Sequence, residues 1–254
     1  MNHKTSAATM APGDHRKPLI MIADAHIGQA QGNIDPFYHM LTALARGSGD
    51  VIFLGDIFDL WIALPRYENT LHRRFLAWCR REKAHRCIGY IEGNHEFFLA
   101  QRHAAAFTWC TQRSWWIDAE ENLFCHGDRI NRRDRKYLAF RLGIRNPITK
   151  MLILGLPMGP RVVRYVKHRL QHTNPPFRKT LPLDQLESFA EDRFTEGAAR
   201  VFLGHFHRPF EYRGRQGGVL HTLPDWFSKG WVSVLKADRK TLQQGPWQDI
   251  LPTR

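Results

Sequence analysis

The chain has 254 residues, 43% of them hydrophobic, which is enough for one substantial core. No segment reaches the roughly 20 apolar residues that span a bilayer, and the first 17 residues lack the apolar centre of a secretory signal. Four cysteines without CxxC spacing indicate reduced thiols in a cytosolic protein and exclude a disulfide framework.

The first element that we predict is a flexible N-terminal segment, residues 1–17, followed by one domain over residues 18–254. Short apolar runs then predict strands that are covered on both faces of a sheet. These runs are 19–24, 51–56, 87–94, 123–128 and 201–205. Helix-like segments at 35–46 and 68–83 separate the early runs, and this alternation predicts an α/β fold with parallel strands.

Between the fourth and fifth runs, the chain becomes strongly basic. Lys and Arg number 37 against 24 acidic residues, and residues 129–179 alone hold 14 basic residues and one acid, Asp134, so this segment carries the whole net charge of +13. Helix-like stretches separated by Pro and Gly predict a basic helical lid inserted at about residues 130–180. Such a segment suits nucleic acid, a phosphorylated ligand or an anionic membrane, and a solvated basic face is the alternative.

Towards the C-terminus, the pattern changes. Residues 218–224 and 230–237 alternate between apolar and polar side chains, and no long helix separates them. This spacing predicts an antiparallel pair of strands.

Side chains that can bind a metal lie at or just after the end of each of the five apolar runs. In chain order they are Asp24 and His26, Asp56, Asn94 and His95, His126, and His205 with His207. A single D-x-H or H-x-H pair is commonly a turn or a surface pair. Because the carboxyl ends of parallel strands meet at one crevice, five such pieces in order predict one shared site.

The donor types point to phosphate ester hydrolysis. Carboxylate, imidazole and amide oxygens suit Mn, Fe or Zn. The donors outnumber what one tetrahedral ion needs, so we expect two divalent ions, with Asp56 as the bridge. Asp59, three residues further on, suits a helix cap or a supporting role.

The motifs D-x-H, G-D, G-N-H-E, H-G-D and G-H-x-H occur here in an order that resembles the calcineurin-like metallophosphoesterases, over residues 19–235. The resemblance implies a four-layer α/β/β/α sandwich with two metals, often manganese or iron. It implies that His95, beside Asn94, acts on the leaving oxygen or on developing charge. The implied ligands are Asp24, His26, Asp56 and His207 for one metal, and Asp56, Asn94, His126 and His205 for the other.

Longer stretches, such as "HGDRINRRDRKYLAFR" and "RVVRYVKHRLQ", resemble one branch of that family, the UDP-2,3-diacylglucosamine diphosphatases of lipid A synthesis. The branch implies a cytoplasmic enzyme in peripheral contact with the anionic inner membrane. It implies cleavage of an acylated nucleotide-sugar pyrophosphate to UMP and lipid X. Tyr137 matches a lid tyrosine near the substrate, and we expect Arg132, Arg141 and Arg169 to bind the second phosphate.

One departure leaves alternatives open. The branch typically reads G-N-R-D where this chain reads "GNHE", residues 93–96. A metal-dependent hydrolase of another phosphoester, such as a nucleotide or a phospholipid-like compound, is therefore the second hypothesis. A third is a membrane- or nucleic-acid-binding adaptor on an inactive scaffold. The complete donor set argues against inactivity, and nucleic acid is not expected because the lid lacks a stacking platform.

Overall fold

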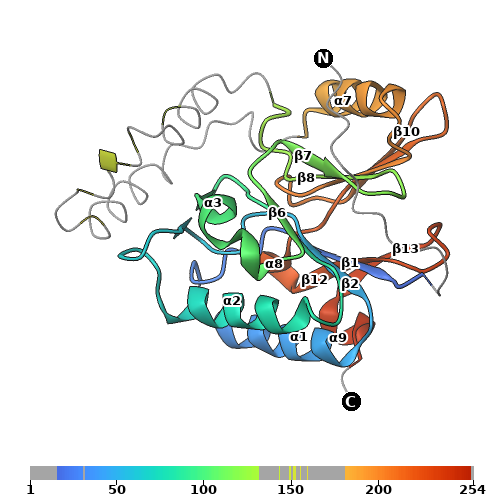
Figure 1. The fold of residues 1–254 in the computed structure, drawn as a ribbon. Coiled ribbons are helices and arrows are strands. Elements are labelled where there is room, and N and C mark those ends of the chain that lie inside the picture. The colour runs from blue at the N-terminus through green and yellow to red at the C-terminus, as the bar shows by residue number, and fades with distance from the viewer. Residues whose placement is uncertain are drawn as a thin grey trace.

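The protein is represented by a computed structural model that describes residues 16–30, 32–131 and 181–252, with six isolated positions between 143 and 159. Its described part contains two large β-sheets (Figure 1). The first sheet has the order β13 (Leu242–Pro246), β12 (Trp231–Leu235), β1 (Leu19–Ile22), β2 (Asp50–Phe53), β4 (Ile88–Ile91) and β6 (Trp109–Thr111). The second has the order β10 (Phe210–Arg213), β11 (Val219–Thr222), β9 (Arg200–Leu203), β8 (Asn122–Cys125) and β7 (Trp115–Ile117).

Smaller elements complete the described part. A two-stranded parallel ribbon pairs β3 (Trp61–Ile62) with β5 (Glu96–Phe97). The long helices are α1 (Ile34–Arg46), α2 (Thr70–Glu82) and α7 (Leu183–Thr195). The short ones are α3 (Leu99–His103), followed by a 3₁₀ turn at Ala104–Ala106, α8 (Trp226–Lys229) and α9 (Trp247–Ile250).

Packing of β1 shows why its run is apolar throughout. Ile20 and Ile22 point into a cluster that also contains the buried faces of α1 and α2. Leu19 and Met21 point the other way, into a cluster shared with Phe124 of the second sheet. A third cluster lies between the second sheet and α7. The layers are therefore helices, sheet, sheet and helix (Figure 1), which confirms the predicted α/β/β/α class.

The predicted antiparallel pair near the C-terminus is wrong. β11 pairs with β10 and β9 in the second sheet, whereas β12 pairs with β1 and β13 in the first. Between them, Asp225 caps the short helix α8 by accepting from Ser228 N at 2.8 Å. Gly230 then takes a left-handed backbone conformation, φ 64°. The chain thus crosses between the sheets instead of forming a hairpin.

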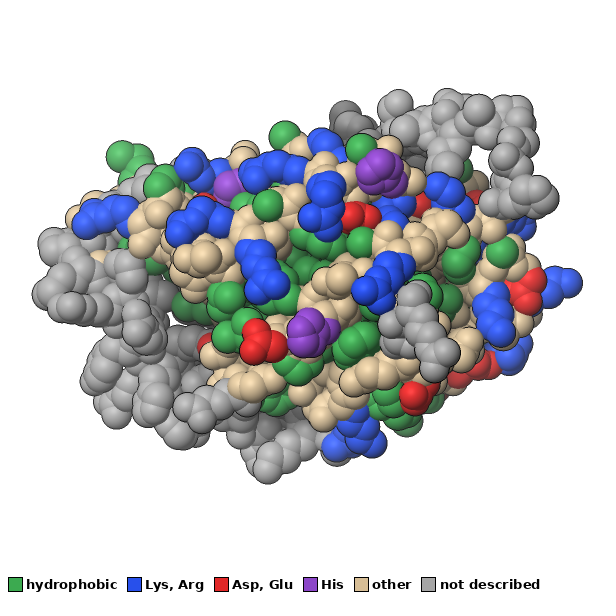
Figure 2. All heavy atoms as spheres, turned by 90° about the horizontal axis from the view of Figure 1, so that it is seen from below, with side chains coloured by type: hydrophobic (Ala, Val, Ile, Leu, Met, Phe, Trp, Pro, Cys, Tyr) green, Lys and Arg blue, Asp and Glu red, His purple; other side chains and the backbone are tan. Residues whose placement is uncertain are grey.

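The outer face of α2 is more basic than the balanced composition outside residues 129–179 suggests. Its arginines Arg73, Arg74, Arg80 and Arg81 are exposed, while its only acid, Glu82, is buried. Figure 2 shows basic side chains spread over the face that carries α1 and α2. Counting charges along the chain missed this, because burial removes the acid from the surface. Among the described residues, no helix has the length and apolarity needed to cross a membrane.

A buried arginine joins the first sheet to the end of α1. The guanidinium of Arg86 donates to the carbonyl oxygens of Leu44 and Gly49 at 2.9 and 3.0 Å, and to Gly47 at 2.7 Å. Its Nε lies 3.2 Å from the buried Glu82 carboxylate. Arg86 therefore satisfies carbonyl groups that the end of a helix leaves without partners.

Replacing Arg86 by Met is expected to lower the free energy of unfolding by about 3–5 kcal/mol, because it removes the buried partner of the Glu82 carboxylate together with the donors to three backbone carbonyl oxygens. Urea unfolding measures this loss. The matched control is Arg81→Met, since Arg81 contacts the same Glu82 from the surface, with 62% of its side chain exposed. A loss no larger for Arg86→Met than for the control would contradict the assignment.

Candidate metal centre

The predicted metal-binding residues lie in the loops that follow β1, β2, β4, β8 and β9. β1, β2 and β4 are parallel neighbours in the first sheet, and β8 and β9 are parallel neighbours in the second. Their carboxyl ends thus open at one edge of the sandwich. Backbone hydrogen bonds join the first two loops, from Asp24 N to Gly55 O at 3.1 Å and from His26 N to Asp56 O at 3.0 Å.

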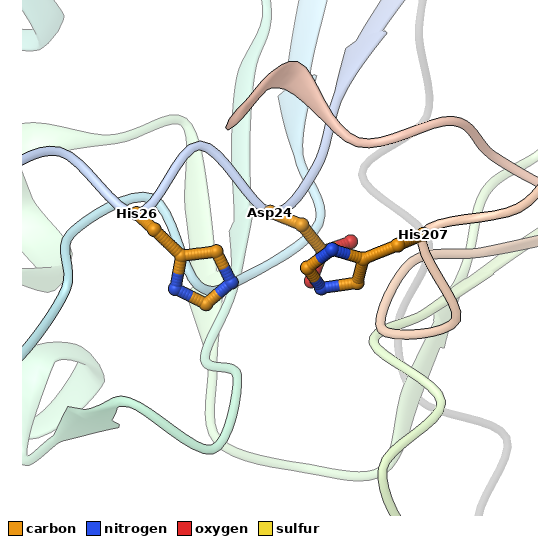
Figure 3. Close-up of side chains that lie close together, drawn as sticks. All are labelled: Asp24, His26 and His207. Atoms are coloured by element: carbon orange, nitrogen blue, oxygen red, sulfur yellow. The ribbon is translucent and has the colours of Figure 1, made fainter. Parts of the chain in front are cut away.

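In the described part of the chain, three groups of side chains have ligand atoms within 4.8 Å of one another. They are Asp24, His26 and His207; His26, Asp56 and His95; and Asp56, His126 and His205. Figure 3 shows the first group, in which side chains that come from two different loops converge. Asn94 joins the third, because its Oδ1 lies 3.0 Å from His126 Nε2. All eight predicted residues therefore belong to one site.

Asp56 lies at the centre of these contacts. Its Oδ2 is 3.4 Å from His126 Nε2 and 3.9 Å from His95 Nε2. Its Oδ1 accepts from the backbone N–H of His95 at 2.8 Å. Asp56 and His26 each belong to two of the three groups. Of these two residues, only Asp56 has a carboxylate, whose two oxygens suit a bridge between two ions.

Buried polar atoms in this site fit a cation. Within the part of the chain that the structure describes, the buried His26 Nδ1 and Asp24 Oδ1 make no hydrogen bond, although Asp24 Oδ1 lies 3.4 Å from His207 Nε2. An unsatisfied buried oxygen or nitrogen costs about 1–3 kcal/mol, and a bound ion would remove that cost. The donors are carboxylate, imidazole and amide, which suit divalent Mn, Fe or Zn.

Without a bound metal, protons on His126 and His207 balance the negative charge of the carboxylates in the site. Burial works to lower the pKa of His126, but the Asp56 carboxylate outweighs it and raises that pKa to about 10. At His207, burial likewise works to lower the pKa, but the Asp24 carboxylate outweighs it and raises that pKa to about 9. Burial lowers the pKa of His26 and His205 to about 4. Since ligands must lose protons to bind metal, metal affinity should rise with pH over the neutral range.

His95 has its orientation fixed by a backbone group. Its Nδ1 lies 2.5 Å from the carbonyl oxygen of Asp59, which can only accept, so Nδ1 carries a proton. The other nitrogen, Nε2, lies 3.9 Å from the Asp56 carboxylate. No helix begins after Asp59, since β3 follows at Trp61, so the helix-cap hypothesis for Asp59 is wrong. Its carbonyl group orients His95 instead.

The sequence profile of the family described as calcineurin-like phosphoesterase matches residues 17–209. The chain belongs to this family. It is therefore a metal-dependent phosphoester hydrolase.

Relatives of this phosphoesterase include a UDP-2,3-diacylglucosamine hydrolase from Pseudomonas fluorescens, which is 26% identical over 93% of this chain and 97% of its own. A UDP-2,3-diacylglucosamine hydrolase from Blochmanniella pennsylvanica is 28% identical over 75% of this chain and 79% of its own. Among solved structures, a phosphoesterase from E. coli aligns with a TM-score of 0.39 and 12% identity, over 90% of this chain and 98% of that one.

The other predicted site residues of the phosphoesterase, Tyr137, Arg132, Arg141 and Arg169, lie outside the described residues, as does most of the predicted lid. The sequence marked Glu96 as part of the departure from G-N-R-D but gave it no role. The buried Glu96 carboxylate accepts a hydrogen bond from the backbone N–H of Asp56.

Five of the candidate ligands have a left-handed backbone. The φ angles of Asp24, His26, Asp56, His205 and His207 lie between 43° and 69°. This conformation brings the Cβ of an L residue too close to the following carbonyl oxygen, at a cost of about 1–2 kcal/mol each. Such strain collects at functional sites, and here it turns the side chains that follow the strands into the crevice.

His205→Gly should therefore be more stable than His205→Ala by about 1 kcal/mol in metal-free protein. Both variants lack the imidazole and keep the hydrogen bond from the backbone of residue 205 to Asp24 Oδ2 at 2.7 Å. The difference in the free energy of unfolding between the two variants, measured in urea, reports the backbone strain at position 205. As a control, the same pair at His39, exposed on the right-handed helix α1, should show the opposite order. Equal stability of the two variants at position 205 would argue against strain.

Proposed function

We propose that this phosphoesterase cleaves the pyrophosphate of a UDP-linked diacylated glucosamine to UMP and lipid X, in the cytoplasm at the surface of the inner membrane. The similarity to UDP-2,3-diacylglucosamine hydrolases over nearly the whole chain carries this proposal. The basic segment 129–179 supports it, since a pyrophosphate and an anionic lipid surface are both negatively charged.

Exposed apolar side chains on the inserted segment support an acylated substrate. Among the described residues, the most exposed large hydrophobic side chains are Met151, at 73%, and Leu152, at 66%. Apolar residues among basic ones suit a boundary between lipid head groups and acyl chains. On this proposal, Arg132, Arg141 and Arg169 bind the second phosphate, and Tyr137 lies near the substrate.

Two divalent ions, most simply manganese, would be held by the residues of the candidate metal centre. Asp24, His26, Asp56 and His207 would hold one, and Asp56, Asn94, His126 and His205 the other. When bound, such a pair supplies the Lewis acidity that activates water and neutralises charge on phosphoryl oxygens. The carboxylates and imidazoles of the site determine where the positive charge of the ions would lie.

His95 would act on the leaving group. With Nδ1 donating to Asp59 O, a protonated His95 presents Nε2–H towards the crevice. A hydrogen bond from Nε2 would stabilise negative charge on the leaving phosphate oxygen and could transfer a proton to it. His95 is partly exposed, with 27% of its side chain accessible, which leaves it open to a substrate.

A second candidate function keeps the chemistry but changes the substrate. His95 and Glu96 stand where the resembling diphosphatases typically have Arg and Asp. This difference lies beside the proposed bridging carboxylate and favours, as the alternative, a phosphodiester or phosphomonoester without acyl chains.

The deciding experiment incubates manganese-loaded protein with UDP-2,3-diacylglucosamine in detergent and measures UMP and lipid X. The matched substrate is UDP-glucosamine, which has the same pyrophosphate without acyl chains. We expect UMP from both, with a rate at least ~10² higher for the acylated substrate, because remote binding energy accelerates the reaction. Hydrolysis of bis-p-nitrophenyl phosphate without any UMP would overturn the proposed substrate and favour the alternative.

A further inference from the structure

Glu96 is a fully buried carboxylate with four hydrogen-bond donors around it. Its Oε2 accepts from the backbone N–H of Asp56 at 2.8 Å and of Gly93 at 2.7 Å. Its Oε1 accepts from the backbone N–H of Ile57 at 2.7 Å and from the Tyr90 hydroxyl at 2.9 Å. One side chain thus joins the loop after β2 to the loop after β4.

The two consecutive N–H groups of Asp56 and Ile57 both point at this carboxylate. Successive backbone N–H groups around a left-handed residue form a concavity that binds anions, and Asp56 has φ 54°. Here the anion is the protein's own Glu96 side chain. Both N–H groups can donate to Glu96 only in the backbone conformation in which the Asp56 side chain turns into the crevice.

The same segment also fixes the carboxylate of Asp56. The N–H of His95, next to Glu96, donates to Asp56 Oδ1. Gly93 approaches so closely that a Cβ there would lie 2.2 Å from Asp56 Oδ1 and 2.6 Å from Asp56 N. Residues 93–96 therefore clamp both the backbone and the side chain of Asp56.

We propose that Glu96 is a positioning residue for the metal centre, which acts by holding Asp56 in its ligating conformation. The inference rests on Asp56 as a shared metal ligand, and it is independent of which phosphoester is the substrate. It assigns a function to the residue at which this chain departs from the G-N-R-D of the resembling diphosphatases.

Glu96→Gln is the sharpest test. An amide has one oxygen, so its NH₂ must face either two backbone N–H groups, at the Oε2 position, or the N–H of Ile57, at the Oε1 position. Either choice sets donor against donor. The backbone of Asp56 should loosen while every proposed metal ligand is retained.

The control is Glu92→Gln. Glu92 is also buried and directly follows β4, but its Oε1 accepts from Ala100 N in α3. Glu96→Asp tests rescue, because it keeps the charge on a side chain that is shorter by one methylene.

Three measurements separate positioning from simple stability. Titration of metal-free protein with Mn²⁺ should show affinity weakened 10- to 100-fold in Glu96→Gln, the range for residues that orient ligands, and unchanged in Glu92→Gln. Hydrogen exchange of the amides of residues 56 and 57 should be faster only in Glu96→Gln. With bis-p-nitrophenyl phosphate, kcat should fall with little change in KM, and Glu96→Asp should recover part of both metal affinity and kcat.

Glu96→Gln protein with wild-type metal affinity and wild-type exchange at residues 56 and 57 would overturn the proposal, even if it unfolds more easily. Equal losses of metal affinity in Glu96→Gln and Glu92→Gln would overturn it too, since the effect would then be general destabilisation. Failure of the lipid A substrate alone would leave these measurements unaffected.

Discussion

Replacing Asp56 by Asn is expected to lower kcat by ~10³-fold or more and to reduce the bound metal from two ions to one or none. The substitution keeps the shape of the side chain but removes the charge that two of the three ligand groups share. Metal ions supply several kcal/mol of charge stabilisation in such reactions, and each 1.36 kcal/mol corresponds to about tenfold in rate.

Metal content by mass spectrometry and turnover of bis-p-nitrophenyl phosphate measure this directly. Asp50→Asn is the matched control, because Asp50 lies at the opposite end of the same strand, where it accepts from Cys87 N at 2.9 Å. The control should keep two metals and wild-type turnover. If Asp56→Asn also kept both, the bridging role of Asp56 would be wrong.

His95→Ala is expected to lower kcat by roughly 10²- to 10⁴-fold, the usual contribution of a general acid or base, while both metals remain bound. The reason is that His95 completes a ligand group with His26 and Asp56 but is absent from the other two groups, which hold the remaining proposed ligands. The rate loss should be larger for an alkyl leaving group than for p-nitrophenolate, because the latter leaves without a proton.

The exposed His39 on α1 provides the control, and His39→Ala should leave both the metal content and the rate unchanged. Unchanged turnover in His95→Ala would remove His95 from the reaction. Loss of a metal together with turnover would instead make His95 a ligand.

The strands that carry the site could be predicted because both of their faces are buried. Leu19 to Ile22 alternate between two cores, so each position is apolar and the strand ends where the first polar ligand, Asp24, follows. The short strands β3 and β5 have two residues each, too few for any periodicity to show. The pairing of β12 could not be predicted either, because the alternation of apolar and polar residues identifies a strand but does not specify the sheet to which it belongs.

Within the site, residue types could be predicted but backbone conformation could not. Gly most often marks a left-handed position, whereas Asp and His, which adopt it less often, occupy five of them here. Glu96 escaped for a similar reason, since its partners are mainly backbone N–H groups, which leave no trace in the sequence. The left-handed ligands and the buried Glu96 both depart from what their residue types usually favour, as functional sites often do.

The most direct test of the central claim is an anomalous diffraction map of crystals grown with Mn²⁺. We predict two peaks, with the Asp56 carboxylate between them. Asp24, His26 and His207 should lie at one peak, and Asn94, His126 and His205 at the other. A single peak, or two peaks without Asp56 as a shared ligand, would contradict a dinuclear centre built on this carboxylate.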